Sequence, residues 1–404
     1  MITRGEKMLA LRKQRMADSH PFFRGGFRPF FLGGALWALT VLVLWIGALA
    51  GWLTLPTAFD PLAWHRHEML FGYLAAVIAG FLLTAIPNWT GRLPVTGGRL
   101  AALAGLWLAA RLAMLFSAVV GPWTALALDV GFLLVLFVVA AREVIAAKNR
   151  NFPVVIVILL FAMANAIDHA EAMGIAVSEG IGWRAGLGLV LALIALIGGR
   201  IIPSFTRNWL SKQGYKTGLP GQPDWFDKLA LASLVVALIG WVVAPDRTAT
   251  AALLLFAGML HAIRFARWSG YRALRDPLVL ILHVAYAWLP LGLLLLGMSI
   301  FDPALPRTSA LHALTAGAMA SMTLAVMSRA TLGHTGRALR ADGPTVAIYL
   351  LVTFGAAIRV AAPLIPLEYM RVIEVGGLLW GGAFLLFVFA YGPKLVGARP
   401  DGRP

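Results

Sequence analysis

The sequence contains no cysteine. This absence excludes disulfide bonds, iron–sulfur clusters, thiolate zinc sites and the covalent attachment of c-type haem. Any metal must therefore be bound by histidine, methionine, tyrosine or carboxylate side chains. The positions of the eight histidines consequently matter most for metal chemistry.

Charged residues are also scarce, at 13% of 404 residues, whereas soluble domains have about 25%. Hydrophobic residues make up 60%. The apolar runs are too long and too uniform for barrel strands, so we predict an all-α polytopic membrane helix bundle. We expect twelve spans, at residues 30–54, 66–87, 99–119, 123–147, 152–173, 181–202, 225–244, 248–268, 276–299, 309–331, 344–364 and 370–393.

The net charge of +16 could suggest a nucleic-acid partner. The positions of the charges argue against it, because most Lys and Arg residues lie in alternate loops between the spans. Basic loops stay in the cytoplasm, so we place both termini there, as an even number of spans requires. We therefore divide the chain into a basic cytoplasmic arm (1–29), a membrane domain (30–393) and a cytoplasmic tail (394–404).

An internal repeat is visible in the sequence. A Thr-Gly-Arg sequence follows span 2 and recurs after span 10, 245 residues later (90 to 335), and the same interval places His67 on His312 and Gly72 on Gly317. An Ile-Pro sequence also recurs at the ends of spans 2 and 6. These spans are four apart, so we predict three four-helix units. The alternative is that such sequences are common at cytoplasmic ends of spans.

The predicted topology sorts the histidines by depth. The outer layer contains His65, His67, His169 and His312, accompanied by Glu68, Asp168 and Glu171. The inner group contains His261, His283 and His334. A neutral imidazole suits both haem iron and copper. The alternative for each one is a buried histidine that only bonds a neighbouring helix.

Two histidines on different spans are a usual means of holding a haem inside a membrane, and we predict this role for His67 and His312. Haem propionates then need cations. Arg66, Arg359 and Arg371 lie at outer ends of spans and would supply them through paired hydrogen bonds. Ordinary interfacial positioning of long basic side chains explains these arginines equally well.

A copper site has two alternative positions. One is in the outer layer, with His65 and His169, and the other is deeper, with His261 and His283. His65 and His67 are two residues apart, so a regular helix would point them to nearly opposite sides. They would share one metal only if His65 lay before the first helical turn.

Five segments together resemble the NnrS family: Phe27–Phe31, Trp64–Met69 with Gly72, Ile86–Gly91, Gly199–Pro203 with Thr206 and Arg207, and Leu311–Arg337. The resemblance covers nearly the whole chain. It implies a multi-pass protein of the bacterial inner membrane that contains non-covalent haem, of the b type, and copper. It also implies a role in the response to nitric oxide and nitrosative stress, the setting of denitrification, without fixing a reaction.

A second, fold-level likeness is to the haem–copper oxidase catalytic subunit, in which histidines of spans 2 and 10 hold one haem. His67 and His312 match that arrangement. Spans 6 and 7 contain no histidine, so the three-histidine copper site of those enzymes has no counterpart here.

We therefore expect a haem- and copper-binding membrane protein that binds or transforms nitric oxide at a histidine-ligated metal. The alternatives are a twelve-span secondary transporter of a small solute or metal, or a membrane sensor without turnover. The concentration of polar residues near the outer face, rather than at the midplane, argues against the transporter. The lipid bilayer and nitric oxide are the expected partners, and nucleic acid is not.

Overall fold

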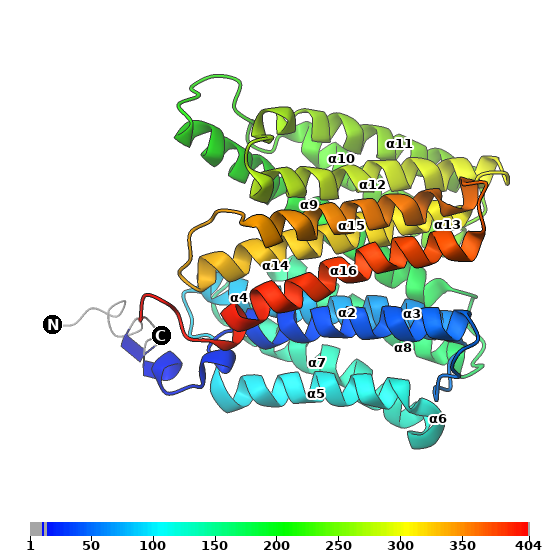
Figure 1. Ribbon diagram of the computed structural model, residues 1–404, viewed down its shortest axis with the longest axis horizontal. Helices are drawn as coiled ribbons and strands as arrows, with labels where there is room; N and C mark the ends of the chain where they lie inside the picture. Colours follow the sequence, from blue (N-terminus) through cyan, green and yellow to red (C-terminus); the bar gives the residue numbers. More distant parts are fainter. Residues whose placement is uncertain (1–9, 12–13, 403–404) are drawn as a thin grey trace. The chain divides into compact units, whose positions relative to one another are not determined.

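The computed structural model describes residues 10–11 and 14–402, and all regular elements in this part of the chain are helices (Figure 1). Twelve helical segments there are long and apolar enough to cross a membrane, which confirms the predicted all-α membrane bundle. The segments are α2 (Phe27–Leu49); α3 (Pro61–His67), the π-helix η2 (Glu68–Leu74) and α4 (Ala75–Thr90); α5 (Gly97–Leu115); α7 (Pro122–Ala146); α8 (Phe152–Ala172); α9 (Ile181–Lys212); α10 (Trp225–Val243); α11 (Thr248–Ala266); α12 (Pro277–Phe301); α13 (Arg307–His312), the π-helix η4 (Ala313–Met319) and α14 (Ala320–His334); α15 (Gly343–Ala361); and α16 (Tyr369–Val396).

Short elements join the spans. They are the 3-10 helices η1 (Pro21–Phe23), η3 (Gly270–Ala273) and η5 (Ala362–Leu364), and the short helix α6 (Ser117–Val120). The helix α9 is longer than the sequence suggested, because it continues through Pro203 to Lys212. A proline removes one backbone hydrogen bond, a loss that the rest of a 32-residue helix tolerates.

The chain forms two compact units. The first contains the chain up to Gly186, together with Ala330–Ala338 and the segment from Val388 onward. In it α2 packs on α4 and η2, and α7 packs on both α5 and α8. The second unit contains Leu187–Arg329 and Leu339–Phe387, and in it α11 packs on α10 and α12, while α12 packs on α13 and η4.

The start and the end of the membrane domain are tied together within the first unit. Arg28 is buried, and its Nη1 donates to the carbonyl oxygens of Leu395 and Gly397 at 2.6 and 2.7 Å. The Phe27 ring lies 5.5 Å from the His334 ring, measured between centroids. The Phe-Arg-Pro sequence at the start of span 1 therefore has a packing role.

Two π-helical stretches interrupt otherwise α-helical spans. The helix η2 directly follows His67, and η4 directly follows His312, 245 residues later (67 to 312). Each is followed by a regular α-helix, α4 or α14, and the starts of these two helices are also 245 residues apart (75 to 320). The interval found in the sequence thus also relates local backbone geometry in spans 2 and 10. Span 6, the third member of the predicted repeat, is the continuous α-helix α9.

Candidate metal site

Six ionisable side chains are buried together in the first unit. They come from five elements, α3, η2, α5, α7 and α8, and each is at most 3% exposed. The group consists of His67, Glu68, Arg111, Asp129, Asp168 and His169. Buried charges are costly unless they are paired or bind a metal, so this group is the first place to look for chemistry.

His67 lies between two carboxylates. Its Nδ1 is 2.8 Å from Oδ2 of Asp168, and its Nε2 is 2.8 Å from Oδ2 of Asp129. The Nε2 atom of His169 lies 3.3 Å from the same oxygen of Asp129. One donor atom each from His67, Asp129 and His169 therefore lies within 4.8 Å of the others, close enough for all three to bind one metal ion.

When a metal occupies the site, the contact with Asp168 would decide which nitrogen of His67 binds it. A carboxylate that accepts the Nδ1 hydrogen fixes the tautomer and leaves the lone pair on Nε2. That nitrogen faces Asp129 and His169. The pattern of carboxylate, imidazole and metal is the usual second layer of a histidine metal site.

The π-helix η2 contributes two consecutive residues at this site. His67 ends α3 and Glu68 begins η2, and both side chains are fully buried. A π-helical turn is wider than an α-helical one and is frequently found at functional sites. On α8, Asn165 is one turn before His169, and its Nδ2 donates to Oδ2 of Asp129 at 2.9 Å.

Arg111 balances part of the negative charge. Its Nη1 donates to Oε1 of Glu68 at 2.7 Å, and its Nη2 donates to Oδ1 of Asp129. The indole of Trp37 donates to the second oxygen of Glu68 at 2.5 Å. A Cβ added at Gly72 would lie within 3.0 Å of all three of these side chains, so glycine is required there for this close approach.

With both imidazoles neutral, the charges of the site do not cancel. Glu68, Asp129 and Asp168 carry three negative charges, against Arg111 and the partly exposed Arg66, which lies 3.9 Å from Asp168. With neutral imidazoles the sum is one negative charge. A metal cation bound between His67, Asp129 and His169 would offset it.

Sequence reasoning missed two members of this site. Arg111 had no role assigned, and Asp129 was not considered. The available signal was a charged residue inside an apolar run, which is rare unless it has a partner or a function. Of the predicted residues, His67 and His169 are brought together, whereas His65 stacks on Trp45 with ring centroids 5.0 Å apart and is not part of the three-donor group.

In the second unit, His261 is held by both ring nitrogens. Its Nδ1 lies 2.7 Å from the hydroxyl of Tyr286, and its Nε2 lies 3.0 Å from the carbonyl oxygen of Ala230. Arg264 donates to the same hydroxyl at 3.1 Å and to Oδ1 of Asp227 at 2.7 Å. Both ring nitrogens of His261 are therefore engaged by protein oxygen atoms, while its predicted role as a copper ligand stays a prediction.

His283 has a different environment. Its Nε2 donates to Oγ1 of Thr206 at 2.9 Å, because the Thr206 hydroxyl already donates to the carbonyl oxygen of Ile202. Its Nδ1 is buried without a hydrogen-bond partner and faces Gly270, where an added Cβ would lie 2.5 Å away. A single imidazole nitrogen is not a metal site.

The Gly198-Gly199 sequence forms a packing notch in the second unit. A Cβ at Gly198 would lie 3.3 Å from the Tyr286 ring, and one at Gly199 would overlap the Arg264 guanidinium.

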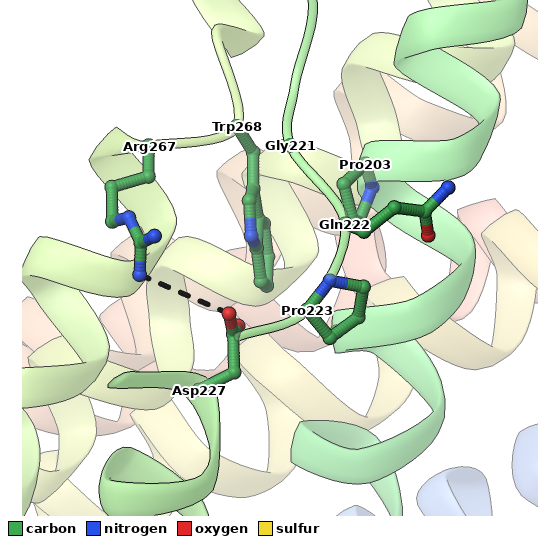
Figure 2. A pocket seen from close by; sticks show the side chains of 8 residues that line it. Pro203, Gly221, Gln222, Pro223, Asp227, Arg267 and Trp268 are labelled. Carbon is green, nitrogen blue, oxygen red and sulfur yellow. Dashed lines mark ion pairs between the residues drawn. The ribbon is translucent and has the colours of Figure 1, made fainter. Parts of the chain in front are cut away.

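A pocket beside this notch is shown in Figure 2, lined by Gly199, Pro203, Gly221, Gln222, Pro223, Asp227, Arg267 and Trp268. Arg267 also donates to Asp224, a bond that holds the pKa of that exposed carboxyl below its usual range.

The predicted propionate-binding residues are distributed over both units. Arg66 lies in the first unit, 4.9 Å over the Trp183 ring. Arg359 lies in the second unit on α15, which packs on the helix α13 that ends at His312. It is hydrogen-bonded to Tyr369 and has a buried Nη1 without a hydrogen-bond partner. The Arg371 side chain is 83% exposed and pairs with Glu368 at 2.7 Å.

His312 donates from Nδ1 to the carbonyl oxygen of Thr308 at 2.7 Å, which leaves its Nε2 with the lone pair. His67 belongs to the first unit and His312 to the second.

Comparison with known proteins adds one finding. No curated protein matches the chain. A family model described as "NnrS protein" matches residues 21–399, which is nearly the whole chain. The chain therefore belongs to the NnrS family.

Proposed function

We propose that this NnrS-family membrane protein acts in the nitric oxide response by binding or transforming nitric oxide at a metal centre held by His67, Asp129 and His169. One observation carries the proposal: two imidazole nitrogens and a carboxylate oxygen converge in a fully buried part of a membrane bundle, and a further carboxylate orients one imidazole. Such an arrangement is expensive to bury without a bound cation.

Copper is the metal we propose. Two imidazoles with one carboxylate form a donor set that copper, non-haem iron and zinc can share. Family membership favours copper among them, and a redox-active metal suits chemistry on nitric oxide. When bound, it would supply an open coordination position for a small neutral ligand.

The surrounding residues prepare this site. Asp168 would hold the His67 tautomer, and Arg111 bridges Glu68 and Asp129 through hydrogen bonds to both. The ring of Phe59 lies 5.2 Å from that of His67 and 5.3 Å from that of His169, and Phe71 lies 5.1 Å from His67. These apolar walls exclude water and strengthen every electrostatic contact inside.

We also propose haem as a second cofactor. Of the two predicted haem ligands, His312 suits the role better than His67. The Nε2 of His312 carries the lone pair, and the partnerless Nη1 of Arg359 suits a propionate. When bound, haem would supply iron as a redox centre or nitric oxide site. Ligation by His67 would require that residue to give up one of its two carboxylates. Arg66 and Arg371 remain candidates for the propionates.

The proposal includes a location. We infer the bacterial cytoplasmic membrane, with both termini in the cytoplasm, from the distribution of Lys and Arg among the loops. This orientation would place the outer end of span 2, and with it His67, near the periplasm. A reporter fused after Arg247 would then be active only as a periplasmic reporter.

Metal analysis and optical spectra of the detergent-purified protein test the proposal. We expect about one copper per chain, lost in His67→Ala and His169→Ala and retained in the matched control His20→Ala. Nitric oxide should perturb the spectrum of the wild type only when the metal is present. Retention of the metal in the His67→Ala/His169→Ala double variant would contradict the proposed centre.

Loss of a Soret band in His312→Ala would support the haem assignment, and an unchanged band would refute it.

A further inference from the structure

Three arginine-bearing segments meet in the first unit, away from the proposed metal site. Arg28 lies in the first turn of α2, and Arg337 lies just after the end of α14. The segments Ala330–Ala338 and Val388–Pro404 belong to the first unit together with the start of α2. The Phe-Arg-Pro sequence of span 1 and the Thr-Gly-Arg sequence after span 10 thus lie in one unit, although about 300 residues separate them (28 to 337).

Specific contacts hold these segments together. Arg28 donates from Nη1 to two carbonyl oxygens at the end of α16. Arg399, which follows that helix, donates from its own Nη1 to the carbonyl oxygen of His334 at 3.2 Å. A Cβ added at Gly336 would lie 2.9 Å from Nη2 of Arg399. The ends of α14 and α16 and the start of α2 are therefore joined by arginine side chains.

The turn after α14 explains the position of Arg337. Gly336 has a φ of +70°, in the left-handed region that glycine adopts without strain. The backbone N–H of Arg337 donates to the carbonyl oxygen of Leu332 at 2.9 Å, and that of Gly336 bonds back to Gly333. These two bonds are the usual glycine-dependent end of a helix. The Thr-Gly-Arg sequence therefore ends the span and places an arginine directly after it.

The same sequence after span 2 provides a comparison within the chain. Gly91 also has a positive φ, of +67°, and Arg92 follows it. Arg92 forms an ion pair with Glu143. In contrast, Nη1 of Arg337 is buried and makes no hydrogen bond to the described part of the chain. A buried donor without an acceptor is costly, so an anion that reached Arg337 would be bound favourably.

Positive charge accumulates around Arg28. Three further arginines act electrostatically on it, and together the four residues form what we call the arginine cluster: Arg24, Arg28, Arg337 and Arg399. Asp401 pairs with Arg399 at 2.6 Å, so the cluster and this carboxylate sum to three positive charges (four minus one). Guanidinium groups match the oxygen pairs of a phosphate group through parallel N–H donors.

We propose that the arginine cluster binds a phosphate group at the edge of the membrane, with Arg337 as its direct contact. The cluster lies where α2 begins and α14 ends, which the proposed topology places at the cytoplasmic surface. Anionic phospholipids carry their phosphate at that level, and basic sites between membrane helices on this side bind such head groups. Inorganic phosphate offers the same oxygen atoms, and the experiment separates the two sources.

Binding of a fluorescent phosphatidylglycerol to the full-length protein in detergent measures the site. Phosphatidylcholine is the reference, because its choline cation offsets the phosphate charge. The wild type should prefer phosphatidylglycerol, and this preference should weaken as salt is added. Arg337→Gln should lower the affinity for phosphatidylglycerol about fivefold or more, whereas Arg337→Lys should keep most of it. The matched control is Arg92→Gln, which removes the same charge from the corresponding turn and should bind as the wild type does.

A variant with the opposite expected effect guards against misfolding as an explanation. Asp401→Asn removes the carboxylate that competes for Arg399, so phosphatidylglycerol should bind about two- to fivefold more tightly. A damaged protein would not gain affinity. Inorganic phosphate, compared with chloride at equal ionic strength, then identifies the source. Displacement of phosphatidylglycerol by phosphate assigns the site to a free phosphate ion, and its failure to displace assigns the site to a lipid head group.

Two results would overturn the proposal. One is a wild type that binds phosphatidylglycerol and phosphatidylcholine equally and whose unfolding temperature phosphate does not raise. The other is an affinity for phosphatidylglycerol that falls as much in Arg92→Gln as in Arg337→Gln, since the loss would then reflect net charge alone rather than a site at Arg337.

Discussion

Oδ2 of Asp168 lies 2.8 Å from Nδ1 of His67, on the side of the ring away from Asp129. This contact uses one nitrogen of the imidazole and leaves the other for Asp129 and His169. Asp168 would therefore act on a bound metal through His67, as a positioning residue, and its effect could be separated from that of the ligands themselves.

Replacement of Asp168 tests this positioning role. Asp168→Asn keeps the shape of the side chain but weakens its hold on the Nδ1 hydrogen, so we expect metal affinity to fall about 10- to 100-fold. Competition with a chelator of known affinity measures the change. The control is Asp246→Asn, an exposed carboxylate paired with Arg307, which should leave metal affinity unaltered. An Asp168→Asn protein with wild-type affinity would show that the contact does not orient the ligand.

Arg111 should be more important for folding than for affinity. Its replacement by methionine leaves Glu68 and Asp129 buried without their cation, and breaking a buried pair in this way costs about 3–5 kcal/mol. Thermal unfolding in detergent should show a large loss of stability in Arg111→Met. The exposed Arg142, 3.7 Å from Glu143, provides the control, since Arg142→Met should change stability by less than about 0.5 kcal/mol.

Added metal should partly restore the Arg111→Met protein, because the cation replaces some of the missing positive charge beside Asp129. Equal stabilisation of the variant and the wild type by the same metal concentration would count against this electrostatic coupling. A variant as stable as the wild type without metal would show that the three carboxylates are not charged together.

Gly72 limits how closely the cluster can pack. Gly72→Ala places a Cβ within 3.0 Å of Glu68, Arg111 and Trp37, so these side chains must move and the cluster must loosen. We expect both lower stability, by about 1–3 kcal/mol, and weaker metal binding. Gly105→Ala is the matched control, because a Cβ there meets no atom within 4 Å. If both variants behave alike, the close approach at Gly72 is not what shapes the site.

The sequence predicted the spans well, because a bilayer leaves an apolar chain few ways to satisfy its backbone. It also pointed to His67 and His169, since ionisable residues at span ends stand out. It did not predict that they share a site with Asp129 and Arg111. That pairing depends on how α5, α7 and α8 pack on η2, and no spacing within one helix encodes contacts between helices.

The roles of the inner histidines could not be predicted from the sequence either. His261 and Tyr286 are 25 residues apart on neighbouring helices, so the sequence left a copper role for His261 open. The structure shows both of its ring nitrogens engaged by protein oxygen atoms. The π-helices could not be predicted either, although the interval of 245 residues between His67 and His312 was visible.

The Tyr286 hydroxyl decides between a structural and a metal-binding role for His261. Tyr286→Phe removes a group that contacts both His261 and Arg264, leaving buried polar atoms without a partner at a cost of about 1–3 kcal/mol. We expect lower thermal stability with an unchanged metal content, and the same pattern in His261→Ala. Tyr271→Phe, at a 74% exposed position, serves as the control and should change neither quantity. Loss of copper from His261→Ala while the protein stays folded would instead restore the deeper site with His283, because a structural histidine has no means of changing the metal content of a folded protein.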